Sequence, residues 1–181
     1  SRTWRPDSSS RFLVTNFKRT HDCGSLGADH IGQKVVLCGW VHRRRDHGGL
    51  IFIDLRDRWG WTQVVFNPAA GEKLHLLAKD LRAEFCIAVN GTVQRRPTGT
   101  ENPKFATGMI EVVAQELEIL NPSATPPFEI SSEEEISEEL RYTYRYLDLR
   151  RPELRDRLIL RHQVIRVIRR GLDQERFIEV E

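Results

Sequence analysis

The side chains best suited to chemistry lie in two apolar, β-favouring stretches and the short loop that joins them. Three consecutive arginines at positions 43–45 precede the pair Gly48-Gly49, and Phe52 follows in the second stretch. An aromatic ring can stack on an unstacked nucleic-acid base while guanidinium groups contact phosphates or base edges. Because Phe52 alternates with Ile51 and Ile53, the pattern alone leaves open whether it faces a ligand or the core.

The three arginines are weak evidence by themselves, since a solvated strand end would carry the same charges. Gln63 and Glu111, on two other predicted strands, strengthen the case for nucleic acid. Amide and carboxylate groups can hydrogen-bond the edge of a base, whereas contacts to phosphates carry no sequence information. The combination favours a protein that binds single-stranded nucleic acid.

No pattern typical of a catalytic or metal site is present. The carboxylates of Asp54, Asp57 and Glu111 are not spaced as an acid and base pair, and neither a glycine-rich phosphate loop nor an activated Ser or Cys is evident. The cysteines are odd in number, far apart and without zinc-ligand spacing, so reduced thiols in a reducing compartment are expected. They are Cys23, Cys38 and Cys86.

Five β-like segments and one helix-like segment must position these side chains. Val, Ile, Phe and Trp recur in the β-like segments, often alternating with polar residues, and Gly and Pro separate them. The segments are Lys34 to Asp46, Leu50 to Asp57, Trp61 to Asn67, Phe85 to Arg96 and Met109 to Leu120, with the helix-like stretch Glu72 to Leu81 after the third. This order predicts an all-β OB-fold barrel, a class that binds ligands on the face of its second and third strands.

Composition and charge limit the class of protein. The chain has 181 residues, 39% hydrophobic and 30% charged, with a formal net charge of +2. These values are ordinary for a globular protein, and no apolar run approaches the roughly 20 residues that cross a bilayer. So small a net charge does not predict nucleic-acid binding through bulk attraction, so a local patch must supply any electrostatic contact.

The chain divides into four predicted parts. Residues 1–19 are rich in Ser and Arg and poor in acid, so a disordered tail is expected, with a remnant of an organellar presequence as the alternative. Residues 20–120 form the predicted OB-fold domain. Residues 121–140 combine prolines with clustered glutamates and predict a linker or hinge, and residues 141–181 begin a second domain.

A long amphipathic helix, followed by the start of a strand at Phe177, is predicted in the last part. Apolar residues recur at helical spacing between many arginines. The apolar positions are Leu154, Leu158, Ile165, Ile168 and Leu172. Such a helix and an unpaired strand need a partner sheet, so the chain is expected to be truncated after Glu181.

Three separated motifs occur in a characteristic order. They are Cys38-Gly39-Trp40-Val41 continuing through Arg43-Arg44-Arg45-Asp46 to Leu50-Ile51-Phe52-Ile53-Asp54-x-Arg56-Asp57, then Gln63-Val64-Val65-Phe66, then Ala106-Thr107-Gly108-x-Ile110-Glu111-Val112. Together they closely resemble the N-terminal anticodon-binding domain of bacterial-type aspartyl-tRNA synthetases. The segment Arg145 to Glu153 resembles the entry to that family's class II catalytic domain. The resemblance extends from about Arg19 to Glu181, and it implies that the helix and strand after Leu154 begin motif 1 of an α+β class II domain.

The resemblance also implies roles for individual residues. Phe52 would stack on the middle uracil of a GUC anticodon, and Gln63 would hydrogen-bond its edge. Glu111 would accept from the first-position guanine, and Arg45 would reach the neighbouring base or backbone. The predicted nucleic-acid-binding residues are Arg43, Arg45, His47, Phe52, Gln63, Arg96, Gly99 and Glu111, with no catalytic residue and no metal ligand in the chain.

Two of these positions concern the choice of tRNA, and others depart from the family's pattern. His47 and Gly99 resemble members that charge both tRNA-Asp and tRNA-Asn, so relaxed reading of the third base is a hypothesis. Trp59 and Trp61 replace a charged and an aliphatic residue, and Gln94 replaces a commonly basic one. The fine contacts near the binding face are therefore expected to differ.

For the full-length protein the resemblance implies ATP-dependent, magnesium-assisted joining of L-aspartate to tRNA, in a cytoplasmic homodimer without membrane contact. An organellar location is the alternative if the tail is a presequence remnant. The 181-residue chain is expected to bind no cofactor and to be inactive alone, because ATP-binding motifs 2 and 3 are missing. A stand-alone OB module for single-stranded nucleic acid stays open as an alternative function, and a lysine- or asparagine-specific relative fits less well.

Overall fold

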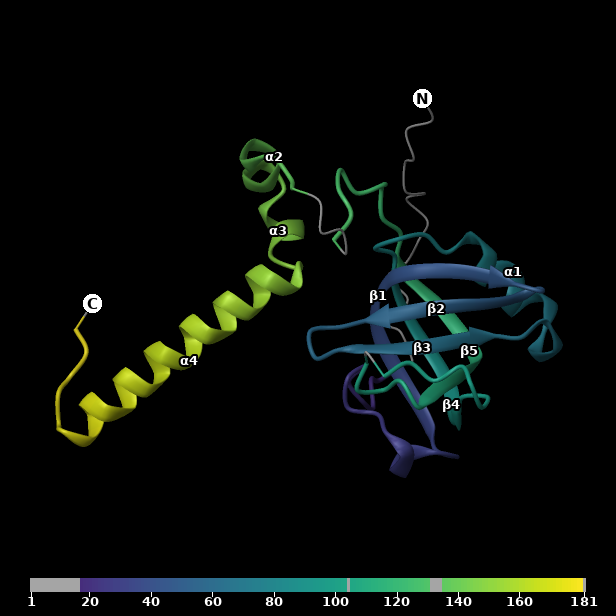
Figure 1. The fold of residues 1–181 in the computed structure, drawn as a ribbon, viewed down its shortest axis with the longest axis horizontal. Helices are drawn as coiled ribbons and strands as arrows, with labels where there is room; N and C mark the ends of the chain where they lie inside the picture. Colours follow the sequence, from purple (N-terminus) through teal and green to yellow (C-terminus); the bar gives the residue numbers. More distant parts are fainter. Residues whose placement is uncertain (1–16, 104, 131–134, 181) are drawn as a thin grey trace. The chain divides into compact units, whose positions relative to one another are not determined.

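The computed structural model describes residues 17–103, 105–130 and 135–180. It divides into two compact units, Ser1–Thr125 and Pro126–Glu181 (Figure 1), and each is described by itself. The division falls within the predicted linker at 121–140. Most of the predicted N-terminal tail, and Glu133 and Glu134 of the acidic cluster, lie outside the described residues.

The first unit is a closed five-stranded barrel with the strand order β1-β2-β3-β5-β4. All neighbouring strands are antiparallel except β3 and β5, which pair in parallel. The strands are β1 (Lys34–His47), β2 (Leu50–Arg56), β3 (Trp61–Phe66), β4 (Cys86–Arg95) and β5 (Ile110–Asn121). The observed closed barrel with a helix after its third strand confirms the predicted fold class.

Alternating apolar residues of the strands fill the barrel. Ile51, Ile53 and Leu55 of β2 are fully buried, as are Leu37 of β1 and Val89 of β4. Successive side chains of a strand point to opposite faces, so these residues fix which neighbours lie outside. The core thereby determines which side chains of β2 can meet a ligand.

Short helices connect and cover the strands. The 3-10 helix η1 (Ala28–His30) precedes β1, and η2 (Pro68–Ala70) leads into α1 (Glu72–Asp80) between β3 and β4. Leu74 and Ala78 are buried on one side of α1, four residues apart as a helix facing a core requires. The helix therefore packs against the barrel where an OB fold places it.

A β-bulge in β1 sets the orientation of the arginines. The register between β1 and β2 shifts between Val41 and Arg43. After the shift, Arg43 lies opposite Asp54 and Arg45 lies opposite Phe52. A bulge adds one residue to a strand and so changes which side chains share a face. Arg43 and Arg45 consequently share the outer face with Phe52.

A buried ion pair lies beside the same strands. Both Nη2 hydrogen bonds of Arg56 go to the carboxylate of Glu84, at 2.9 and 3.0 Å, and the side chains are 6% and 5% exposed. Arg56 Nη1 is 3.0 Å from Nδ1 of His42. Burial, followed by the charges of Arg56 and Arg43, lowers the pKa of His42 to about 4. The imidazole is therefore neutral at pH 7 and accepts from the guanidinium.

The described residues of the second unit form three helices, α2 (Glu138–Thr143), α3 (Arg145–Asp148) and α4 (Pro152–Gln174). The fully buried carboxylate of Asp148 lies 3.3 Å from Arg141, 2.9 Å from Arg145 and 3.8 Å from Arg151. The predicted amphipathic helix is present as α4. Residues 177–180, where a strand was predicted to begin, have no strand pairing, because a strand needs a neighbour for its hydrogen bonds.

Candidate nucleic-acid interface

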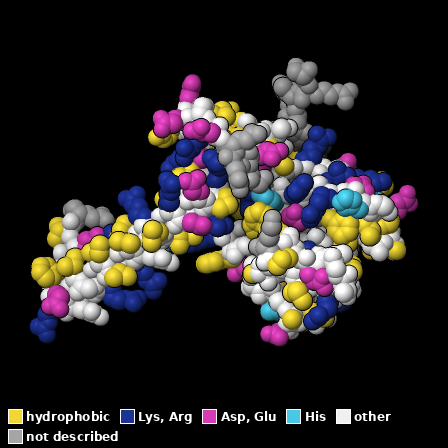
Figure 2. All heavy atoms as spheres, viewed as in Figure 1, with side chains coloured by type: hydrophobic (Ala, Val, Ile, Leu, Met, Phe, Trp, Pro, Cys, Tyr) yellow, Lys and Arg dark blue, Asp and Glu magenta, His cyan; other side chains and the backbone are white. Residues whose placement is uncertain are grey.

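The outer face of β1, β2 and β3 carries a hollow of about 270 Å³. Figure 2 shows basic, histidine and apolar side chains gathered over these strands. The hollow is lined by Arg45, His47, Leu50, Phe52, Gln63, Val65, Pro97, Thr100 and Glu111. Five of the eight predicted site residues therefore meet in one place, although four strands, β1, β2, β3 and β5, and the loop between β4 and β5 supply the lining.

Phe52 lies on the outer side of the barrel. Its neighbours Ile51 and Ile53 are fully buried, whereas Phe52 is half-buried and lines the hollow. The centroid of its ring lies 6.2 Å from that of His47, at an angle of 59°. The core needs only one side of β2, which leaves the Phe52 ring free to stack on a planar ligand.

A chain of polar contacts crosses the floor of the hollow. Arg45 Nη2 donates to Asp54 Oδ1 at 2.5 Å and lies 3.4 Å from Gln63 Oε1. Gln63 Nε2 in turn donates to Glu111 Oε2 at 3.0 Å. The amide of Gln63 is thus held at both ends, and one N–H and one lone pair remain for a ligand.

The two carboxylates of this chain are partly desolvated. Burial raises the pKa of Asp54, against the opposing charge of Arg45, and burial raises the pKa of Glu111, against the hydrogen bond from Gln63. A charged group in such surroundings interacts more strongly with its partners than it would in water. Polar groups of a base edge would therefore meet strong, fixed partners here.

Arg96 has a different place from the one predicted. Only 7% of the residue is exposed, its Nε donates to the carbonyl of Ile110 at 3.0 Å, and its Nη1 donates to the carbonyl of Thr100 at 3.4 Å. Burial lowers the pKa of Arg96, while the charge of Glu111 raises it. Arg96 therefore holds the loop between β4 and β5 in place and supports the ionised form of Glu111, rather than presenting its charge to a ligand.

Arg43 and Gly99 lie outside the lining of the hollow. Arg43 is exposed on β1, where a phosphate could reach it. Gly99 is exposed in the loop after β4 with φ +88°, a conformation that side chains rarely adopt. Its N–H donates to Glu101 at 2.7 Å. Gly99 thus shapes the loop that brings Pro97 and Thr100 to the hollow.

The sequence reasoning missed Asp54 as a member of the site. Asp54 faces Gln63 on β3 and contacts Arg45. The signal was available, because Asp54 stands two residues after Phe52 and must share its face of the strand. Leu50, Val65, Pro97 and Thr100 were also missed, and the loop residues among them carry no sequence pattern that places them beside β2.

The unusual tryptophans have separate surroundings. Trp59 is 60% exposed in the turn between β2 and β3, and the Arg58 guanidinium lies 4.9 Å from its ring centroid. Asp57 accepts from the backbone N–H groups of Trp59 and Gly60 and fixes this turn. The Trp61 ring packs against His42 and Phe105, with centroid distances of 4.2 and 5.1 Å.

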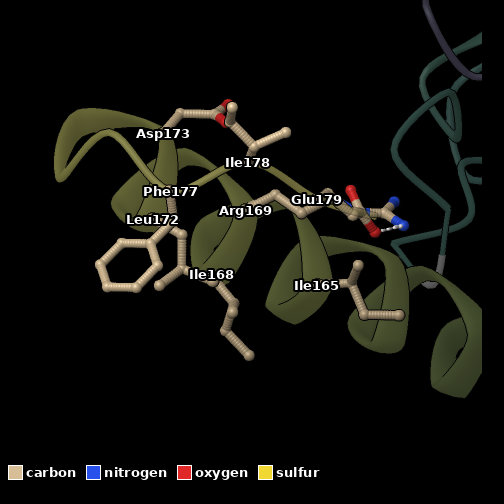
Figure 3. Close-up of a pocket in the computed structure, with 8 residues that line it drawn as sticks. All are labelled: Ile165, Ile168, Arg169, Leu172, Asp173, Phe177, Ile178 and Glu179. Atoms are coloured by element: carbon tan, nitrogen blue, oxygen red, sulfur yellow. Dashed lines mark hydrogen bonds and ion pairs between the residues drawn. The ribbon is translucent and has the colours of Figure 1, made fainter. Parts of the chain in front are cut away.

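A second candidate surface lies on α4. A groove of about 310 Å³ forms between the helix and residues 177–179 (Figure 3), and its apolar lining includes Ile168, Leu172 and Phe177. Arg169 donates to Glu179 across it at 2.7 and 3.0 Å. Phe177 is 64% exposed and Ile168 56%. Apolar exposure on this scale marks an interaction surface.

Other classes of site find no support in the described part of the chain. No three or more His, Cys, Asp or Glu residues among residues 17–103, 105–130 and 135–180 gather in a metal-binding arrangement. In the same ranges, no helix has the length and apolar character needed to span a bilayer.

The barrel and its polar, aromatic face match a known class of domain. Residues 35–120 match the family model of the OB-fold nucleic acid binding domain, and residues 137–181 match the model of tRNA synthetases class II (D, K and N). The chain thus joins a match to an OB-fold nucleic acid binding domain with a match to the class II tRNA synthetases.

Over nearly its whole length the chain is similar to aspartate–tRNA ligases. It is 56% identical over 168 residues to the "Aspartate--tRNA(Asp/Asn) ligase" of Rubrobacter xylanophilus, and 52% identical over 169 residues to that of Desulfatibacillum aliphaticivorans. Each alignment covers 93% of this chain and 28% of the relative. The chain thus spans little more than a quarter of the length of these relatives.

Solved structures of related synthetases share the architecture. Asparaginyl-tRNA synthetase from Pyrococcus horikoshii is 28% identical with a TM-score of 0.77, over 91% of this chain and 37% of that one. Aspartyl tRNA synthetase from Entamoeba histolytica gives a TM-score of 0.82 at 17% identity, over 97% of this chain and 41% of that one. The second likeness concerns the fold alone.

Proposed function

We propose that the hollow on β1, β2 and β3 reads the anticodon of tRNA-Asp as part of an aspartate–tRNA ligase. The observation that carries this proposal is the meeting of Phe52, Gln63, Arg45 and Glu111 in one hollow, supported by the OB-fold and class II family matches. The class II match at residues 137–181 favours a ligase over a stand-alone single-strand-binding module.

Each group has a distinct task in this recognition. The Phe52 ring stacks on the middle base, since the side of β2 on which it lies is open. The free N–H and lone pair of Gln63 meet the edge of that base. Glu111 accepts from the first-position guanine, and Arg45 and Arg43 contact a neighbouring base or the backbone. Stacking on an aromatic ring is sequence-tolerant, so the polar groups supply the discrimination.

Binding of an anticodon stem-loop tests the proposal. Fluorescence anisotropy of the 181-residue chain with a GUC stem-loop should show Phe52→Ala binding about 5- to 150-fold more weakly, the equivalent of about 1 to 3 kcal/mol for one stacked base. Gln63→Ala should also weaken binding. Trp59→Ala is the matched control, because it removes an exposed ring from the far end of β2. Equal affinity of Phe52→Ala, Gln63→Ala and the unsubstituted chain would contradict the proposal.

The choice between tRNA-Asp and tRNA-Asn depends on the third anticodon base. Two relatives of this chain carry the name Aspartate--tRNA(Asp/Asn) ligase. His47 is exposed at the edge of the hollow, beside the Phe52 ring, and we propose that it tolerates either pyrimidine at that base. Comparable aspartylation rates for tRNA-Asp and tRNA-Asn by the full-length protein are expected, and a strong preference for tRNA-Asp would contradict this assignment.

The whole protein is proposed to use ATP, magnesium and L-aspartate and to form a homodimer. The exposed apolar stripe of α4 and the groove at Phe177 are suited to a second copy of the chain, as expected of class II motif 1. No step of anticodon recognition passes through ATP or the metal. Sedimentation of the full-length protein with Ile168→Asp should show a monomer, whereas an unchanged dimer would exclude this surface.

A further inference from the structure

We propose that Asp54, Arg45 and Glu111 together hold the Gln63 amide in one orientation, and that this orientation selects uracil over cytosine at the middle anticodon base. The inference rests on the proposed anticodon recognition and assigns the positioning role in it to Asp54.

The contacts of Gln63 permit one orientation of its amide. Oε1 faces the guanidinium of Arg45 at 3.4 Å, and Nε2 donates to Glu111 at 3.0 Å. A guanidinium has only donors, and an ionised carboxylate has only acceptors. Rotating the amide by 180° would place its NH₂ against Arg45 and its oxygen against Glu111, so both contacts would become repulsive.

Asp54 keeps Arg45 in the position that this arrangement requires. Its side chain is 13% exposed and accepts from the same Nη2 of Arg45 that faces Gln63. The Arg45 side chain is 34% exposed, so without Asp54 it could turn toward solvent. The Cα atoms of Asp54 and Gln63 are paired across β2 and β3, and Asp54 acts on Gln63 through Arg45.

The two pyrimidines present opposite patterns to a fixed amide. Uracil offers an N3–H donor next to the O4 acceptor, whereas cytosine offers an N3 acceptor next to the N4 amino donor. Once a base is stacked on Phe52 with its backbone direction set, a fixed amide matches one pattern and opposes the other. If the amide could rotate, it would match both. The polar contacts that hold the Gln63 amide therefore convert a sequence-tolerant stacking site into one that distinguishes bases.

The test compares two RNA stem-loops that differ only in the middle anticodon base, GUC and GCC. With the 181-residue chain, we expect GUC to bind about 10- to 100-fold more tightly, the discrimination typical of a well-matched polar pair. In Glu111→Gln the new amide can donate or accept, so the ratio should fall to within about threefold. Asp54→Asn, which no longer holds Arg45 by charge, should also lower the ratio, and Asp54→Glu should restore it.

Two variants separate a positioning role from a general loss of structure. Asp46→Asn removes a carboxylate from the same hairpin, but Asp46 is 45% exposed and lies 3.9 Å from Arg44, so the ratio should not change. Trp59→Ala removes an exposed ring at the far end of β2 and should likewise leave the ratio unchanged. Circular dichroism melting checks folding, and Glu111, which is only half-buried, provides the test if Asp54→Asn is unstable.

The outcomes distinguish this inference from the proposed function. If the unsubstituted chain binds GUC no more tightly than an unrelated loop, the proposed function fails. If it prefers GUC but Asp54→Asn and Glu111→Gln keep the full preference over GCC, anticodon binding stands and the positioning role of Asp54 is refuted.

Discussion

Breaking the buried Arg56–Glu84 ion pair should greatly lower the free energy of unfolding of the barrel. Removing one partner takes two buried, charge-assisted hydrogen bonds from the remaining charge, at a cost of about 3–5 kcal/mol. Both side chains are at most 6% exposed, and the pair is joined by two hydrogen bonds, so the full range applies. Glu84→Gln and Arg56→Met are the single changes.

The magnitude is large compared with the stability of the domain. A domain of about 100 residues has a free energy of unfolding of about 5–15 kcal/mol, so either single variant should lose about a fifth of it or more. With a urea m-value of about 1.5 kcal/mol/M, the unfolding midpoint should fall by about 2–3 M. The double variant removes both charges and should be no less stable than the worse single variant.

Urea unfolding followed by tryptophan fluorescence measures this effect, because Trp61 contacts His42, the neighbour of Arg56. A double-mutant cycle then gives the coupling energy between the two side chains. Losses under 1 kcal/mol in both single variants, or a double variant whose loss equals the sum of the two, would refute the reasoning.

Three further predictions concern pH, salt and thiol chemistry. The pKa of His42 is lowered to about 4 in the folded chain, so between about pH 6.5 and 4 this imidazole takes up a proton only in the unfolded chain. The free energy of unfolding should therefore fall by about 1–2 kcal/mol over that range, after allowance for solvent screening. Urea midpoints at pH 7.5 and 4.5 measure the loss, and an equal loss in His42→Gln would contradict the assignment. If Arg43 contacts a phosphate, Arg43→Gln should reduce the slope of log affinity against log salt for the GUC stem-loop by about 0.7, and an unchanged slope would remove Arg43 from the interface. Burial raises the pKa of Cys23, which is fully buried, so a thiol reagent on the native chain should modify the partly exposed Cys38 and Cys86 first; peptide mapping that finds Cys23 labelled early would disagree.

The strands of the barrel could be predicted because local pattern and tertiary environment agree. Ile51, Ile53 and Leu55 alternate with polar or aromatic residues, as a strand with one buried face requires. The turn residues Gly48-Gly49 and Gly60 mark where the strands end, and each observed strand limit lies within one residue of the predicted one. The family resemblance was needed to predict the side to which Phe52 points, and in the structure the burial of its neighbours defines that side.

The remaining parts of the site depend on contacts between distant segments. Arg96 stands beside a Pro and Gly loop and looks like a surface residue, yet its guanidinium binds carbonyl groups of Ile110 and Thr100. Pro97 and Thr100 lie in the loop between β4 and β5 and reach the hollow because these two distant strands pair. Nothing local to these residues encodes such proximity, so sequence patterns alone could not predict it.

The bulge between Val41 and Arg43 separates two kinds of constraint within one strand. Residues before it are spaced to fill the barrel, and residues after it are spaced to meet Phe52 and Asp54. Deleting His42 would leave Arg45 opposite Phe52, because His42 is the residue that the pairing with β2 skips. The pairing with β2 therefore sets the ligand face, and the extra residue instead brings an imidazole to the buried ion pair of the barrel.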